Sequence, residues 1–178
     1  MTDGTPASEL TFENAIAQTQ ALLDQLEQQS LSDAELEAAI AQLVQTQNGA
    51  RGFFVTYLPD DRAIADQPTP AVVSALQSAP DTVAELMVKN AAMASAMAIA
   101  HRRNQNEDLA QGSDRVRSRS LALIAKLQLP QIHEKAIALR ESAVTGIGAY
   151  QTFLDRWGYD AEQRQVIAET MTMILSEA

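Results

Sequence analysis

The sequence predicts an all-α protein, a single-domain bundle of seven or eight helices with one long central helix. Three observations support this fold class. Apolar residues recur three or four positions apart over most of the 178 residues, which is the spacing of one helix face. Capping residues or prolines precede most of these segments. No segment stands out as a convincing strand, with apolar and polar residues alternating along its length.

The first two helices are expected near the N-terminus. Residues 1–10 are small and polar, and we expect them to be flexible. Thr11 is placed to cap a first helix, because its hydroxyl can accept a hydrogen bond from a free N–H of the first turn. Ser32 and Glu35 match a capping box at the start of a second helix. The Asn-Gly pair at 48–49 is interpreted as the end of that helix, because both residue types tolerate the left-handed backbone that closes a helix.

Residues 50–58 combine strand-forming side chains with helical spacing. The large residues of this segment are Phe53, Phe54, Tyr57 and Leu58. Their composition also suits a strand, and we prefer a short helix because the chain offers no partner strand. Residues 59–67 are interpreted as a polar loop. The Thr-Pro pair at 69–70 then starts another short helix, because proline suits a first-turn position.

The longest helix is expected in the middle of the chain. Pro80 opens it, and we expect it to continue to about Gln111. Gly112 is interpreted as its stop, because glycine readily closes a helix. Ser113 would then cap the following helix.

Two more helices complete the expected set. Pro130 begins a helix that we expect to continue to Gly158, with an apolar stripe that includes Ile137, Val144 and Ile147. The two glycines within 146–148 indicate a close helix contact or a bend, because glycine within a helix costs about 1 kcal/mol relative to alanine. Asp160 and Gln163 suggest a capping box before the last helix.

The helices are expected to form one domain over residues 11–178. Short loops favour the packing of consecutive helices as antiparallel neighbours. The loop at 59–69 is the one candidate seam. An acidic helical hairpin at 11–58, packed on a bundle at 69–178, is therefore a second description of the same domain.

The charge of the chain is strongly negative and unevenly distributed. The net charge of −10 argues against nucleic acid and against an anionic membrane surface as partners. Residues 1–66 contain eleven acidic residues and two arginines, a net of −9, whereas residues 101–140 contain eight basic and four acidic residues, a net of +4. This asymmetry suits attraction of an acidic partner to the basic segment.

The composition also predicts a soluble, cytoplasmic protein. The chain has no cysteine, which excludes a disulfide framework and a thiolate metal site. Residues 1–10 lack the basic and apolar regions of a signal peptide. The uncharged stretch Asn90–Ala100 has eleven residues, and the longest uncharged stretch, residues 67–80, has fourteen. A membrane-spanning helix needs about 20.

Four arginines and a histidine are candidate residues for binding a ligand or partner: Arg102, Arg103, Arg115, Arg119 and His101. On a helix, Arg115 and Arg119 share one face, and a turn at Gly112 would bring the first pair near them. Convergent guanidinium groups suit a phosphate or a carboxylate. The alternative, which is the commoner role of such charge runs, is a set of solvated arginines that pair with neighbouring acids.

No residue is assigned to catalysis, to a metal or to a cofactor. His101 follows a methionine-rich face formed by Met87, Met93 and Met97, but His133 lies 32 positions away and neither histidine has a companion ligand motif. The sequence contains no phosphate-binding loop, nucleophile elbow or dinucleotide fingerprint. The methionines are therefore interpreted as adaptable core residues.

The aromatic residues fall into two groups. The first aromatic group is Phe53, Phe54 and Tyr57, and the second aromatic group is Tyr150, Phe153, Trp157 and Tyr159. Each group could line a ligand pocket or anchor the core, and the core is the simpler interpretation. Whether the two groups meet is left open.

Two segments carry a resemblance to a protein family. The run Asn48–Leu58 (NGARGFFVTYL) and the run His101–Glu107 (HRRNQNE) resemble segments of an uncharacterised family of helical proteins from cyanobacteria. The resemblance covers most of the chain. It implies a cytoplasmic role in a photosynthetic bacterium, and it implies neither an activity nor any functional residue.

These observations favour a non-enzymatic interaction or regulatory protein, acting as an adaptor or a homo-oligomer. The expectation rests on the charge asymmetry, the methionine-rich face and helices suited to groove binding. The alternative is a binding protein, or an enzyme, for a small anionic ligand held by the arginines inside the bundle. Arginines in a concave, aromatic-lined pocket would favour the ligand, and arginines on a convex face would favour a protein partner.

Overall fold

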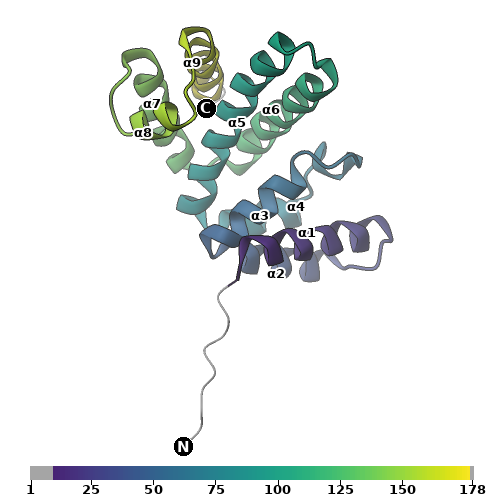
Figure 1. The fold of residues 1–178 in the computed structure, drawn as a ribbon. Helices are drawn as coiled ribbons and strands as arrows, with labels where there is room; N and C mark the ends of the chain where they lie inside the picture. The colour runs from purple at the N-terminus through teal and green to yellow at the C-terminus, as the bar shows by residue number, and fades with distance from the viewer. Residues whose placement is uncertain (1–9, 177–178) are drawn as a thin grey trace, which may run out of the picture.

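The computed structural model describes residues 10–176, which contain nine α-helices, one short 3-10 helix and no strand (Figure 1). The predicted all-α fold is confirmed. The elements are α1 (Phe12–Glu27), α2 (Asp33–Val44), α3 (Gln47–Tyr57), η1 (Ala63–Ala65), α4 (Pro70–Gln77), α5 (Pro80–Arg103), α6 (Glu107–Leu127), α7 (Pro130–Thr145), α8 (Gln151–Arg156) and α9 (Ala161–Ser176). Of these α-helices only α8, with six residues, is shorter than two turns. Residues 1–9, most of the segment predicted to be flexible, lie outside the described range.

Helices α1–α4 form one half of the molecule and α5–α9 the other (Figure 1). Helix α1 packs mainly against α3, and α2 packs against α3 and α4. In the second half, α5 packs against α6, α7 and α9, and α7 packs against α9. The expected antiparallel pairing of consecutive helices therefore holds for α5 and α6, whereas α1 pairs with the next helix but one. Residues 11–58 form three helices rather than a hairpin.

Gly52 explains why α1 packs on α3. A Cβ atom at this position would lie 2.4 Å from the Cβ of Ala15 and 3.0 Å from the backbone oxygen of Phe12. The missing side chain leaves a notch into which the backbone of α1 fits. Close approach of two helices at a glycine is therefore the physical reason for the pairing.

The predicted helix starts near the N-terminus are confirmed, but one predicted stop is wrong. The Thr11 side chain accepts a hydrogen bond from Asn14 N at 3.1 Å, and the capping box of Ser32 and Glu35 is complete. The Asn-Gly pair at 48–49 does not end a helix; it lies in the first turn of α3. Thr46 caps α3 by accepting a hydrogen bond from the N–H of residue 49 at 3.0 Å, so the segment that follows is helical, as preferred.

The boundary between the two longest helices is also shifted. Helix α5 ends at Arg103 and not near Gln111, because Gln105 takes a left-handed backbone (φ 57°) and turns the chain. Asn106, and not Ser113, caps α6 by accepting a hydrogen bond from the N–H of residue 109 at 3.1 Å. Gly112 therefore lies inside α6 instead of stopping a helix.

The helix expected over 130–158 is divided into two. Helix α7 ends at Thr145 and is closed by Gly146, whose φ is 78°; Gly148 has a φ of 122°. These glycines therefore mark a break that separates α7 from α8. The capping box before α9 is confirmed: Asp160 and Gln163 exchange backbone-to-side-chain hydrogen bonds of 3.0 and 3.1 Å.

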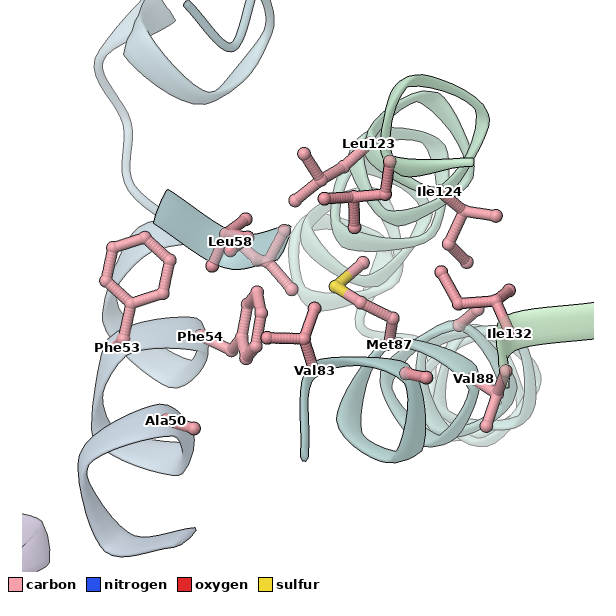
Figure 2. Close-up of a cluster of buried hydrophobic side chains, with 14 of the residues drawn as sticks. Ala50, Phe53, Phe54, Leu58, Val83, Met87, Val88, Leu123, Ile124 and Ile132 are labelled. Carbon is pink, nitrogen blue, oxygen red and sulfur yellow. The ribbon is translucent and has the colours of Figure 1, made fainter. Parts of the chain in front are cut away.

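One hydrophobic core joins the two halves. Figure 2 shows Phe54 of α3 beside Val83 and Met87 of α5, with Leu123 of α6 and Ile132 of α7 completing the cluster. Within the described range, α5 is the one helix long and apolar enough to be compared with a membrane span, and 56% of its most apolar window is buried inside the fold. It occupies the centre of the bundle, as a core helix does.

Substitution of Gly112 by alanine is expected to stabilise the protein by about 0.5–1 kcal/mol, because alanine has the higher helix propensity. Apart from the backbone of its own helix, a Cβ atom at this position would have no atom within 4 Å, so no clash opposes the gain. The midpoint of urea unfolding should rise. A lower midpoint would show that this turn of α6 requires glycine.

Candidate functional site

The first two candidate arginines lie at the C-terminal end of α5 and bind carboxylates. Arg102 binds Glu107 at 3.1 Å and Asp114 at 2.6 Å; Arg103 binds Asp160 at 2.5 Å and also Glu162. Both side chains are nearly half exposed. They tie the end of α5 to the first turns of α6 and α9. The hydrogen bond from Arg103 lowers the pKa of the Asp160 carboxyl below its ordinary value.

The other two candidate arginines hold the loop between α3 and α4. Arg115 lies 3.2 Å from the exposed carboxylate of Asp61. Arg119 is buried, with 5% of its side chain exposed, and binds Asp66 at 2.7 Å. Its guanidinium also donates hydrogen bonds to the backbone oxygens of residues 58, 60 and 62, at 2.8, 2.6 and 3.2 Å. The hydrogen bond from Arg119 lowers the pKa of the Asp66 carboxyl.

The four arginines therefore do not surround a common cavity. Each guanidinium is neutralised by at least one carboxylate. Acids of the loop at 60–66 bind the basic helix α6, so part of the charge asymmetry seen in the sequence is cancelled inside the fold. This arrangement favours the alternative of paired arginines and removes the basis for an arginine-lined anion site.

Neither histidine takes part in the ion pairs described above. His101 is half buried in the last turn of α5. His133 is exposed on α7 and lines an apolar pocket of about 580 Å³ together with Ile124, Leu129 and Ile174. Among residues 10–176, no group of three or more histidine, aspartate or glutamate side chains is placed to hold a metal ion.

The structure separates the roles of the two aromatic groups. The first is part of the core: the rings of Phe53 and Tyr57 stack with centroids 5.0 Å apart, and both are buried. In the second, Phe153 packs edge-on against Tyr150 at 6.4 Å. Both residues line a pocket of about 550 Å³, and Trp157, which is 51% exposed, lies at the same pocket.

This pocket, here named the lysine pocket, is formed by Glu85 and Lys89 of α5, Lys135 of α7, and Tyr150, Phe153 and Trp157 of the α8 region. The Glu85 carboxylate is 2.8 Å from Lys89 Nζ and 3.0 Å from Lys135 Nζ, and it accepts a hydrogen bond from the Tyr150 hydroxyl at 2.9 Å. Burial raises the pKa of Glu85, but these three hydrogen bonds outweigh it and hold the pKa below the ordinary value.

Sequence reasoning missed the lysine pocket. The pair Glu85 and Lys89 has the i,i+4 spacing of an ordinary surface ion pair. Lys135 lies 46 positions from Lys89 along the chain, and no local pattern connects them. The one available signal was the second aromatic group, for which a pocket had been left as an alternative.

All three tyrosines of the chain are expected to resist ionisation. Burial raises the pKa of Tyr57 and of Tyr159 to about 12, and burial together with the hydrogen bond to Glu85 raises the pKa of Tyr150. Because the folded pKa lies above the unfolded value of 10.0, the neutral phenols contribute stability below pH 10 that is lost as the pH rises through the folded values.

A spectrophotometric titration measures this effect. The folded protein should show little phenolate absorbance at pH values where the protein in denaturant is already ionised, and the absorbance should appear together with alkaline unfolding. Phenolate formation near pH 10 with retained helicity would contradict the burial of these hydroxyls.

A second surface feature is a groove between α7 and α9, with a volume of about 840 Å³. We name it the α7–α9 groove; among the residues that line it are Arg140, Ala143, Val144, Arg164, Ala168 and Glu169. Val144 is 71% exposed, and Ile147, just beyond the groove residue Gly146, is 66% exposed. Both residues were expected in the apolar stripe of a single helix over 130–158; Val144 instead lies on an exposed face of α7, and Ile147 lies in the break after α7.

Comparison with protein-family models gives a match over most of the chain. The family model described as "Uncharacterised conserved protein UCP020893" matches residues 11–174. The matched segment includes all nine helices apart from the last residues of α9, and it contains both the lysine pocket and the α7–α9 groove. No curated protein and no solved structure gives a significant match. The chain belongs to the family of uncharacterised conserved proteins UCP020893.

Proposed function

We propose that this protein is a non-enzymatic helical module that binds another protein through the α7–α9 groove, as an adaptor or regulator. The observation that carries the proposal is the combination of this groove with the two exposed aliphatic side chains beside it, Val144 and Ile147. An amphipathic helix commonly places its apolar face in such a groove.

The shape of the groove suits this role. Helices α7 and α9 pack side by side, and small residues line the groove between them at Ala143, Ala161 and Ala168. Val144 lines its α7 side, Ile147 follows the groove residue Gly146 in the chain, and both keep most of their surface in contact with water. Covering apolar surface contributes about 25 cal/mol for each Å² removed from water, so a partner that covers them gains binding free energy.

The charges of the groove indicate the chemistry of the partner. Arg140 lines the groove and forms no ion pair with any carboxylate of residues 10–176. The neighbouring Arg164 is already bound to Asp155 at 2.8 Å. Glu169 also lines the groove and forms no ion pair with a cation of the described residues. We therefore propose an amphipathic segment whose apolar residues cover Val144 and which carries an acidic side chain for Arg140 and a basic one for Glu169.

Site-specific photocrosslinking tests the proposal in the source cells. A benzophenone amino acid replaces Val144, and the matched control carries it at Val55, another exposed valine on α3. We expect a crosslinked product of discrete mass from position 144 and none from position 55. Adding Arg140→Glu to the first variant should reduce the product, because the acidic residue of the partner then faces a like charge.

Three other results have defined meanings. A product of twice the chain mass would show that the partner is a second copy of this chain and that the protein is a homo-oligomer. Equal products from both positions, or none from position 144, would contradict a docking role for the groove.

We place this function in the cytoplasm of a cyanobacterium, on the basis of the composition and of the sequence resemblance.

A further inference from the structure

We propose that the lysine pocket binds a small molecule that carries an anionic group, a carboxylate or a phosphate, on a flat aromatic body. This site is separate from the α7–α9 groove and involves none of the arginines considered above. The inference rests on an excess of positive charge in the pocket and on its aromatic walls.

The lysine pocket has more cations than carboxylates. Lys89 and Lys135 share the single carboxylate of Glu85. In every other ion-paired group within residues 10–176, the carboxylates equal or outnumber the cations. The group of three therefore has a net charge of +1, in a chain whose net charge is −10. At the pocket's edge, Arg156 and Glu134 cancel each other in sign.

The two ammonium groups keep hydrogen-bonding capacity. Each lysine has three N–H donors, and its ion pair with Glu85 uses one of the three. Both side chains are about 30% exposed, at 31% for Lys89 and 29% for Lys135, so they are partly desolvated but open to the pocket. Partly buried charges attract an anion more strongly than fully solvated ones, because the surrounding dielectric constant is lower.

Aromatic residues supply the apolar part of the site. Lys89 Nζ lies 5.3 Å from the ring centroid of Phe153 and 5.8 Å from that of Tyr150, which fixes the ammonium against the pocket wall. Trp157, the only tryptophan of the chain, lies at the pocket with half of its surface exposed. An exposed indole ring offers a face on which a flat ligand can stack. The volume of about 550 Å³ is in the range of small-molecule sites.

The position of Trp157 provides a direct readout of binding. We would titrate the full chain with benzoate and with phenyl phosphate, and follow the fluorescence of Trp157. Benzylamine and benzyl alcohol serve as cationic and neutral controls of similar size. A saturable change is expected with the anions, and a weaker or absent one with the controls. The stronger of the two anions identifies the carboxylate or the phosphate as the preferred group.

Two substitutions with opposite expected effects make the test specific. Lys135→Gln should weaken binding of the anionic probe by about tenfold, because it removes a charge-assisted hydrogen bond. Glu85→Gln should strengthen it, because the charge of the group rises from +1 to +2. Lys126→Gln, on the exposed face of α6, is the matched control and should leave the affinity unchanged. Circular dichroism confirms that each variant is folded.

The proposal fails if neither anion gives a saturable change, or if benzylamine binds as tightly as benzoate. It also fails if Glu85→Gln weakens binding in a folded variant, because that result would assign the lysines to a structural role only. Neither result bears on the crosslinking expected at position 144, so the two proposals are tested independently.

Discussion

Replacement of Arg119 by alanine is expected to lower the free energy of unfolding by about 3 kcal/mol, because it breaks a buried, hydrogen-bonded charge pair. The guanidinium binds Asp66 and three backbone oxygens of the loop between α3 and α4. The oxygen of Leu58 is buried and would lose this donor. The midpoint of urea unfolding should therefore fall strongly.

Two further variants separate this role from a general effect of charge. Arg115→Ala on the same helix should change the stability by less than about 1 kcal/mol, as is usual for an exposed ion pair. Its partner Asp61 is 94% exposed. Arg119→Lys should be intermediate, because an ammonium keeps the charge but lacks the planar fork that reaches four oxygens. Equal effects of the alanine substitutions at 115 and 119 would contradict the proposed role of the buried arginine.

Replacement of Gly52 by alanine is the second change with a large expected effect. The added Cβ atom would lie 2.4 Å from the Cβ of Ala15 and 3.0 Å from the backbone nitrogen of Ile16. Because one of these contacts is backbone, α1 must move away from α3 to relieve it. Overpacking of this kind typically costs about 1–3 kcal/mol. The melting temperature of the variant should therefore be lower than that of the unsubstituted protein.

The control is the same substitution at Gly112, which also lies inside a helix. There the added methyl group meets open space, and the stability should rise. Helix propensity alone predicts a gain at both positions. Opposite signs at 52 and 112 would show that the contact between α1 and α3 dominates at residue 52, and a gain at both would contradict the close approach of these helices.

The elements that were predicted correctly depend on local chemistry. The caps at Thr11 and Ser32, and the capping box that begins at Asp160, each involve side chains and backbone N–H groups within three residues of one another. The incorrect boundary between α5 and α6 has a backbone cause. Gln105 adopts a left-handed backbone that is uncommon for its residue type, whereas Gly112, which suits that conformation, remains helical.

The candidate site was predicted less well, because its charges are neutralised over long distances in the chain. Arg119 lies 53 positions from Asp66, and Arg103 lies 57 positions from Asp160. A sequence shows that arginines cluster but not which carboxylates reach them. The anion-binding alternative consequently named the arginines, while the group with excess positive charge is the pair Lys89 and Lys135.

The sequence by itself determined that this chain is helical and where most helices begin. It also favoured the core as the place of the first aromatic group. These properties depend on spacing and capping within a few residues, which the chain carries in its linear order. The tertiary structure alone decided that α1 packs on α3, that Val144 and Ile147 are exposed, and that two lysines share one carboxylate. Those properties arise when segments distant in sequence compete for the same space and the same counter-charges, and no local pattern records the outcome of that competition.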